Sequence, residues 1–276
     1  MLQSDYESGF IAMRALRFEL KGETAFFKKP DVNSYAYFTY SHIHKIALLG
    51  LLGAVLGLGG YLQQYDANFP LAANRKKARE LQVFPEFYAV LQQARISIVP
   101  HGDRGYFAKK IQIFNNTVGY ASQEEGNVLN VREQWLEKPH WTVYVAEDGL
   151  EAAVFARLSD FLLQLQCVYM PYLGKNDHPA AISEPALVTL AASQTVSFID
   201  SFYPGDTMHC KLRGKSKPGQ DKYFFKEYMP VALNAENNGY VFQPLVLTNH
   251  EIDPASIQAA DAGRLYGDGE RVLYFI

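Results

Sequence analysis

A strict alternation of apolar and polar positions marks the first regular element of the chain. Over residues 13–20, apolar side chains alternate with Arg17 and Glu19. A period of two is typical of a strand that buries one face and exposes the other. Similar patterns predict further strands at residues 95–99, 107–114, 141–145 and 182–190.

Residues 46–62 carry no charge and are almost wholly apolar. The segment is close to the roughly 17 residues that can just cross a bilayer. Its five glycines make it a poor isolated helix, so we predict a helix buried on a sheet and no membrane span. Gly50, Gly53 and Gly57, with Ala54, are expected to let its backbone approach the strands.

Two more helices are predicted, at residues 85–93 and 150–164. Asp148 stands at the N-terminal end of the second, and apolar residues recur along it at helical spacing. Residues 63–82 are polar and contain a basic run that is typical of a solvated helix face: Arg75, Lys76, Lys77 and Arg79.

In chain order these elements read strand, helix, strand, inserted hairpin, strand, helix, strand. That order predicts an α+β fold with a ferredoxin-like (RRM-like) βαββαβ domain at residues 12–192. The inserted hairpin is expected at about 101–139, where Gly119 and Gly126 signal turns. From 193 to 276 only short strands are predicted, in a smaller β-rich C-terminal lobe: 196–200, 207–212, 223–233, 240–247 and 271–275.

The composition is that of a folded globular protein, with 48% hydrophobic and 20% charged residues in 276. A net charge of −3 excludes a whole-molecule positive field that would attract nucleic acid. Any RNA contact must therefore come from local basic patches. This favours a subunit of an assembly over a free-standing RNA-binding protein.

Cys167 and Cys210 are the only cysteines, and they form no CxxC pair. Neither a disulfide framework nor a zinc site is indicated, and we expect two partly buried thiols in a reducing compartment. The first ten residues lack the basic region and apolar stretch of a signal peptide. A cytoplasmic location is expected.

The most informative stretch, residues 39–45, stands directly before the apolar helix. The start of a helix offers unpaired N–H groups and a partial positive charge, which suit phosphate oxygens. This stretch adds hydroxyls, two imidazoles and an ammonium group, from Tyr40, Ser41, His42, His44 and Lys45. In the alternative interpretation Ser41 only caps the helix and the histidines are solvated.

Two further groups combine cations with aromatic rings, as single-stranded nucleic acid binding requires. The first consists of Phe26, Phe27, Lys28 and Lys29, and the second of Arg104, Tyr106, Lys109 and Lys110. A third basic group, at residues 211–222, is equally well explained as a solvated loop.

Catalytic and cofactor motifs are absent from the sequence: it contains no P-loop, GxSxG or HExxH pattern. The His42-x-His44 pair has no third ligand nearby in sequence, so no metal and no cofactor are expected. Tyr40, His42 and one of Lys109 or Lys110 are the candidates for an RNA-cleaving group, the runner-up hypothesis.

Six segments resemble a known family: LRFELKG, AFFKKPD, TYSHIHKIALLGLLGAVLGL, REQWLEKPHWTVYV, YLGKNDHPAAI and RVLYFI. They are similar to the "Cas-five" family of the RAMP superfamily, subunits of type I CRISPR Cascade complexes. The two later internal segments agree with its type I-B branch. The similarity is most specific over residues 15–58.

The resemblance implies a ribonucleoprotein subunit of antiviral defence that binds the 5′ handle of the crRNA. Such a subunit caps the filament of the Cascade backbone subunit, docks the large PAM-reading subunit and meets target DNA only indirectly. The inserted hairpin would act as a thumb. The implied RNA-binding residues are Lys28, Lys29, Tyr40, Ser41, His42, His44, Lys45, Arg104, Lys109 and Lys110, to which we add Arg132.

In one branch, type I-C, the family member itself cuts precursor RNA with a Tyr, Lys and His set. Tyr40 matches the Tyr of that set. The Lys-His dipeptide expected after the second strand is absent, because Lys109 and Lys110 are followed by Ile111. We therefore expect no catalytic residue. The alternative is a metal-independent endoribonuclease that processes precursor crRNA.

Overall fold

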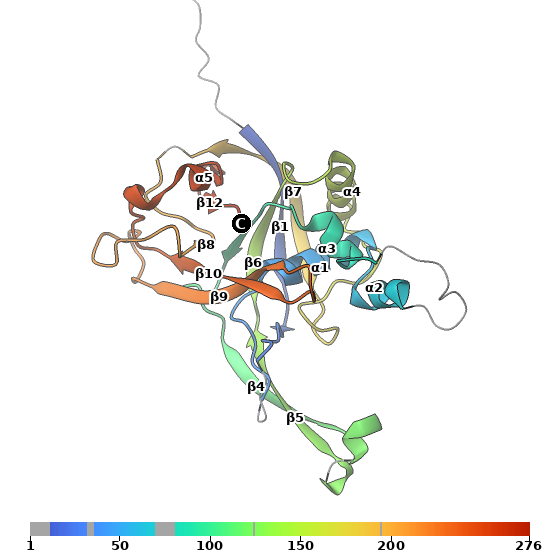
Figure 1. Ribbon diagram of the computed structural model, residues 1–276. Helices are drawn as coiled ribbons and strands as arrows, with labels where there is room; N and C mark the ends of the chain where they lie inside the picture. Colours follow the sequence, from blue (N-terminus) through green and yellow to red (C-terminus); the bar gives the residue numbers. More distant parts are fainter. Residues whose placement is uncertain (1–11, 32–35, 70–80, 124, 194) are drawn as a thin grey trace, which may run out of the picture.

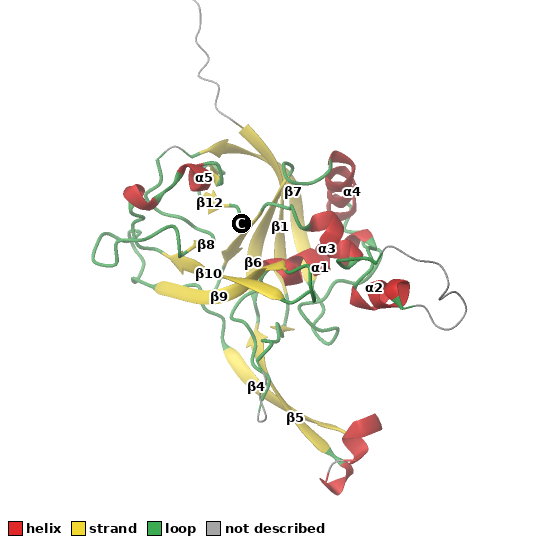
Figure 2. Cartoon of the chain, viewed as in Figure 1, coloured by secondary structure: helices red, strands yellow, loops and turns green. Residues whose placement is uncertain are grey.

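The computed structural model describes residues 12–31, 36–69, 81–123, 125–193 and 195–276. The basic run at Arg75, Lys76, Lys77 and Arg79 lies outside these ranges. The fold is a mixed α+β arrangement in which a six-stranded sheet carries helices on one side and a long hairpin extends away (Figures 1 and 2).

The six-stranded sheet has the strand order β12-β11-β7-β1-β6-β3. Its four long members correspond to predicted strands: β1 (Ala12–Lys21), β3 (Ile96–Pro100), β6 (His140–Ala146) and β7 (Ala181–Ala192). Each of the four is antiparallel to its neighbours. The helices α1 (Lys45–Leu56) and α4 (Ala152–Leu163) fall between β1 and β3 and between β6 and β7 in sequence.

The alternation over residues 13–20 places two kinds of side chain on the two faces of β1. Leu16, Phe18 and Leu20 are fully buried in the main core together with the leucines of α1. Glu19 lies on the other face, as the period of two requires. The burial of these apolar faces against each other fixes α1 across the sheet.

The apolar segment predicted as one helix is broken. α1 ends at Gly57, which has a φ of +77°, and α2 (Tyr61–Asn68) follows after a bend of 77°. In the described part of the chain no single helix is long and apolar enough to cross a membrane, and this bent pair alone passes by length and composition. The leucines of α1 are buried within the protein.

The glycines of α1 serve a different contact from the one predicted. A Cβ at Gly53 would lie 2.6 Å from the Cβ of Phe87, in the short helix α3 (Glu86–Leu91). At Gly57 it would lie 2.8 Å from Val168. These glycines therefore let α3 and the segment around residue 168 pack closely against α1. They do not serve a contact between α1 and the strands.

The inserted hairpin is formed by β4 (Lys109–Asn116) and β5 (Leu129–Glu137), with short 3-10 turns η1 (Gly119–Gln123) and η2 (Glu125–Asn127) at its tip. The strand predicted at 107–114 is therefore its first arm. The short β2 (Thr24–Ala25) pairs with the base of β5 to complete a separate three-stranded sheet. Figure 1 shows the hairpin projecting away from the other elements.

The C-terminal part contributes to two sheets. β10 (Tyr240–Thr248) pairs with β9 (Phe224–Leu233) on one side and with β8 (Tyr203–Pro204) on the other. β11 (Leu265–Gly267) and β12 (Val272–Tyr274) extend the six-stranded sheet. Two backbone hydrogen bonds between Ile96 and Ile276 bring the last residue to β3, so the sheet is nearly closed.

Three expectations for the C-terminal part were wrong. No strand forms at 196–200 or 207–212, and helical turns occur where only strands were predicted: η3 (Pro254–Ser256) and α5 (Ala259–Ala262). Side chains hold both turns, since Asp253 and Asp261 accept backbone N–H bonds there. The two thiols are free as expected, but Cys167 is exposed.

Candidate nucleic-acid interface

The predicted phosphate-binding turn before α1 lies mostly inside the protein. Tyr40, His42 and His44 are buried, with His42 fully so. Tyr40 and Tyr240 of β10 both pack edge to face with His44, with ring centroids 5.1 Å and 5.5 Å from it. The side chains of Tyr40, His42 and His44 therefore expose too little surface to contact RNA.

His44, and not Ser41, caps α1. Its Nδ1 accepts a hydrogen bond from the N–H of Ala47 at 3.2 Å, which satisfies one of the donors at the helix start. Burial lowers the pKa of His44 to about 3, so the ring is neutral at neutral pH. The helix terminus is therefore capped by a side chain and covered by rings.

Lys45 points toward the end of the chain. Its Nζ donates to the backbone oxygen of Ile276 at 3.2 Å. Burial, and to a lesser extent Arg264, lowers its pKa to about 8. Lys45 thus joins the helix start to the edge of the six-stranded sheet.

His42 is part of an aromatic core. Its ring is surrounded by Phe107, Phe202 and Phe225, with centroids 4.9–5.2 Å away. Trp141 of β6 donates its indole N–H to His42 Nδ1 at 3.3 Å. Burial lowers the pKa of His42 to about 3. The neutral imidazole links the central sheet to the sheet of β9 and β10.

Two of the predicted cations, Lys29 and Lys109, meet around one carboxylate. Lys29 Nζ lies 2.8 Å from Glu227 Oε1 of β9, and the N–H of Ser41 donates to Glu227 Oε2 at 2.9 Å. Lys109, the first residue of β4, donates to Ser41 Oγ at 2.9 Å. We call Lys28, Lys29, Ser41, Lys109 and Glu227 the lysine cluster.

Two ammonium groups and one carboxylate leave the lysine cluster positive even before Lys28 is counted. Partial burial lowers the pKa of Lys109, and Glu227 and Lys29 act on it in opposite directions. The backbone N–H of Ser41 and its hydroxyl stand between the two cations. Two ammonium groups and a hydroxyl at one point suit a phosphate oxygen.

Lys28 extends the lysine cluster onto the inserted hairpin. Its Nζ lies 4.0 Å above the ring of Tyr37, a cation–π contact. The N–H of Tyr37 donates to the carbonyl of Arg132, and its own carbonyl accepts from Gln134. The loop is thereby hydrogen-bonded to β5. Tyr37 and Phe38 are both exposed and offer aromatic faces for bases.

One face of the hairpin continues this surface. Lys109, Ile111 and Ile113 alternate along β4, and the register places Arg132 directly opposite Ile113 on the same face. The two isoleucines and Arg132 are exposed. This face is an apolar surface with a cation at each end. Such a surface fits the sugars and phosphates of an extended single strand of RNA.

Lys110 and Arg104 lie elsewhere. Lys110 is on the opposite face of β4, where it pairs with Glu137 at 3.6 Å and approaches the ring of Trp135. Arg104 occupies a turn with a φ of +51° and pairs with Asp103 and Asp221 beside the C-terminal lobe. The residues predicted as one group at the hairpin base therefore point in three directions.

Two of the three aromatic partners predicted from the sequence are not available at the surface. Phe26 and Phe27 are buried, because this segment lies between residue 173 and residues 37–40, to which its backbone is hydrogen-bonded. The third, Tyr106, is exposed, and in the described part of the loop before α1 the exposed rings are those of Tyr37 and Phe38. Glu227 was also missed, since nothing in its own strand signals a contact with the loop.

The residues predicted for RNA cleavage do not meet at one accessible surface. A general base must come within hydrogen-bond reach of the nucleophile, yet Tyr40 and His42 are enclosed. Burial raises the pKa of Tyr40 further above its ordinary value, with smaller contributions from Tyr240 and Glu227. Among the four residues considered for RNA cleavage, only Lys109 and Lys110 are accessible, and they lie on opposite faces of β4.

No protein-family model matches the sequence, and no curated protein matches it. Among solved structures, the chain is similar to one from a "CRISPR RNA-guided surveillance complex", with 12% identity, a TM-score of 0.45 and coverage of 93% of this chain and 95% of that chain. A second is a CRISPR protein from Archaeoglobus fulgidus, with 10% identity, a TM-score of 0.42 and coverage of 95% and 99%. At such values neither similarity identifies a function.

Proposed function

We propose that this chain is a non-catalytic subunit of a type I CRISPR Cascade complex, of the "Cas-five" kind and nearest to type I-B. It binds the 5′ handle of the crRNA, caps the filament of backbone subunits and docks the large PAM-reading subunit. Target DNA is met only within the assembled complex. The proposal combines the sequence resemblance with the geometry of the lysine cluster.

The strand order supports a ferredoxin-like assignment for residues 12–192. The four strands lie side by side in the order β7-β1-β6-β3, and each is antiparallel to its neighbours. α1 and α4 lie in the two crossover connections, as in a βαββαβ unit. In this proposal the hairpin of β4 and β5 is the thumb, and residues 193–276 form the β-rich lobe that supplies Glu227.

The convergence of Lys29, Ser41 and Lys109 carries the proposal. The three come from the loop before α1 and from the root of the hairpin, and the resemblance implicates both of these segments in handle binding. Arg132 and the aromatic side chains of Tyr37 and Phe38 extend the surface along the thumb. We therefore propose Lys28, Lys29, Ser41, Lys109 and Arg132 as the handle contacts.

Burial of Tyr40 and His42 supports a non-catalytic role, because these were the candidates for acid–base chemistry. Mature crRNA would then be supplied by a separate endonuclease. Exposed apolar side chains beside α1 and α2, among them Leu62, Tyr169 and Met170, are of the kind that subunit contacts cover. They support a protein that works inside an assembly.

The test is a titration of fluorescent repeat-derived RNA, containing the 5′ handle, with Lys29→Ala/Lys109→Ala. We expect Kd to rise about tenfold at ~0.1 M salt. The slope of log K against log salt should shrink by about 1.4, since each lost phosphate contact on a single strand contributes roughly 0.7. Lys110→Ala, on the opposite face of the same strand, is the matched control.

Unchanged affinity and salt slope in a folded double variant would remove the lysine cluster from the interface. An equal loss in Lys110→Ala would show that general charge, and not this face of the hairpin, determines binding.

A further inference from the structure

The sheet face away from α1 contains a cluster of two histidines and one carboxylate. Glu19 lies on β1, and the register places it opposite Thr142 of β6, with His140 two residues before Thr142. His101 follows directly after β3, and its N–H donates to the carbonyl of His140 at 3.0 Å. Three separate segments of the chain are thus fixed beside one another by backbone hydrogen bonds.

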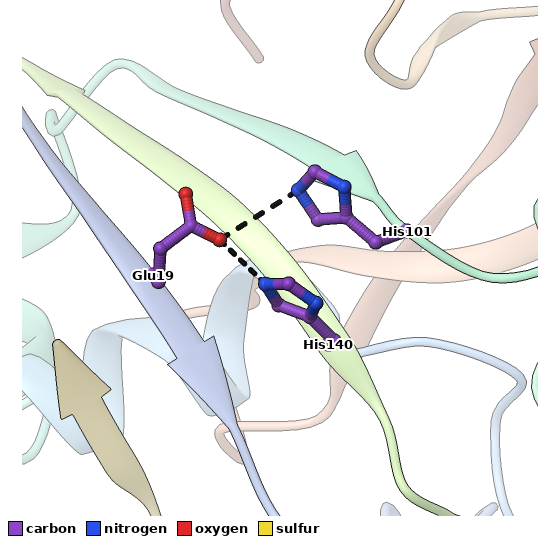
Figure 3. Close-up of side chains that lie close together, drawn as sticks. All are labelled: Glu19, His101 and His140. Atoms are coloured by element: carbon purple, nitrogen blue, oxygen red, sulfur yellow. Dashed lines mark hydrogen bonds and ion pairs between the residues drawn. The ribbon is translucent and has the colours of Figure 1, made fainter. Parts of the chain in front are cut away.

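The two imidazoles converge on one carboxylate oxygen, as Figure 3 shows. His140 Nε2 lies 2.5 Å and His101 Nε2 lies 3.7 Å from Glu19 Oε2. The three candidate ligand atoms all lie within 4.8 Å of one another. The rings stack at a centroid distance of 4.2 Å and an angle of 25°, so both nitrogens are presented in the same direction.

The other carboxylate oxygen is fully engaged. Glu19 Oε1 accepts from the hydroxyl of Thr142 at 2.8 Å and from the guanidinium of Arg17 at 3.0 Å. These bonds hold the carboxylate so that Oε2 faces the histidines. Outer hydrogen bonds that orient a carboxylate in this way are usual behind metal ligands.

An ion can reach the cluster from solvent, because the two histidines are partly exposed. Only 6% of the Glu19 side chain is exposed, compared with 29% for His101 and 32% for His140. The carboxylate is at the bottom and the imidazoles are at the rim. An ion entering from the rim would keep room for water as a further ligand.

We propose that Glu19, His101 and His140 form a site for a divalent transition-metal ion of the Zn²⁺ class. Two imidazoles and one carboxylate suit zinc and its neighbours, whereas Mg²⁺ and Ca²⁺ prefer sets made of oxygen. His140 Nε2 now shares a proton with Glu19 Oε2, and His101 Nε2 lies 2.6 Å from Thr142 Oγ1. The bound ion would replace both of these hydrogen bonds. Neither histidine was singled out from the sequence, because they are far apart along the chain.

The position of the site suggests its purpose. His101 precedes β4 and His140 follows β5, so the two histidines flank the inserted hairpin in sequence. An ion shared between them joins the two ends of the insertion to β1. It would fix the root of the hairpin on the sheet without touching the lysine cluster. The site does not depend on the RNA-binding role.

The site is tested with chelator-treated full-length protein by calorimetric titration with Zn²⁺ and by the visible spectrum on adding Co²⁺. We expect one ion per chain and a Kd at least tenfold higher in His101→Gln and in His140→Gln. His209→Gln, at an exposed histidine outside the cluster, should bind as the parent does. A Cys167→Ser/Cys210→Ser background excludes a thiolate ligand.

Far-UV circular dichroism and urea unfolding establish that each variant is folded before binding is compared. Zn²⁺ should also raise the Tm of the parent protein, and this rise should vanish in His101→Gln/His140→Gln. The proposal is overturned if the parent takes up no ion. It is equally overturned if the folded double variant binds the same number of ions with the same affinity.

Discussion

Glu227 holds the ammonium group of Lys29 at 2.8 Å, although the two residues come from distant parts of the chain. The same carboxylate fixes the backbone of Ser41, which in turn accepts from Lys109. One anion from β9 therefore orients both cations of the lysine cluster. It also weakens their attraction for phosphate, because it neutralises part of their charge.

Replacing Glu227 with Gln should strengthen RNA binding. The amide oxygen still accepts the N–H of Ser41, but the negative charge is gone and Lys29 is released. Removing a single partly exposed charge is worth up to about 1 kcal/mol, so Kd should fall about three- to fivefold. Anisotropy titration with the repeat-derived RNA measures this, and Glu236→Gln in the exposed turn before β10 is the control.

Weaker or unchanged binding in folded Glu227→Gln would contradict this role for the carboxylate. An equal gain in Glu236→Gln would attribute the effect to net charge alone.

The long central strands and α4 could be predicted from sequence because their periodicity is local. Lys28, Lys29 and Lys109 were also predicted, because cations beside aromatic residues are visible as short local groups. Their grouping was not, because Lys109 and Lys110 differ only in which face of β4 they occupy. Burial of His42 could not be foreseen either, since the rings around it come from residues 107, 202 and 225.

The purified protein should not cleave repeat RNA in the presence of chelator. Tyr40 is enclosed, and burial keeps its hydroxyl protonated by raising its pKa. Denaturing gels of RNA incubated with the protein and with Tyr40→Phe would measure cleavage. Product formed by the parent and lost in Tyr40→Phe would reverse the non-catalytic proposal and favour the processing endoribonuclease.

The protein should become less stable as the pH is lowered, because His42 and His44 are buried. An unfolded histidine takes up a proton near pH 6.5, whereas burial holds the pKa of His42 and His44 at about 3 in the folded protein. Between these values the unfolded state binds more protons. The free energy of unfolding therefore decreases as pH falls from 6.5 toward 3, by up to about 1.4 kcal/mol per pH unit for each histidine.

Urea unfolding of His44→Asn between pH 7.5 and 5 tests this assignment. Asn retains an oxygen that can accept from the N–H of Ala47, so the helix cap is preserved while the titrating ring is lost. The pH slope should decrease by up to about 1.4 kcal/mol per pH unit, whereas the exposed His209→Gln should leave it unchanged. A slope equal to that of the parent would show that His44 does not titrate in this way.

Gly50 and Gly53 lie one turn apart on α1 but should respond oppositely to alanine. At Gly53 the added Cβ would be 2.6 Å from the Cβ of Phe87, so α3 must move, and overpacking of this kind costs about 1–3 kcal/mol. At Gly50 the nearest atom is 4.0 Å away, and the gain in helix propensity over glycine is about 0.5–1 kcal/mol. Urea unfolding at pH 7.5 should therefore show Gly50→Ala above the parent in stability and Gly53→Ala below it. If Gly53→Ala were as stable as Gly50→Ala, the close contact between α1 and α3 would not exist in solution.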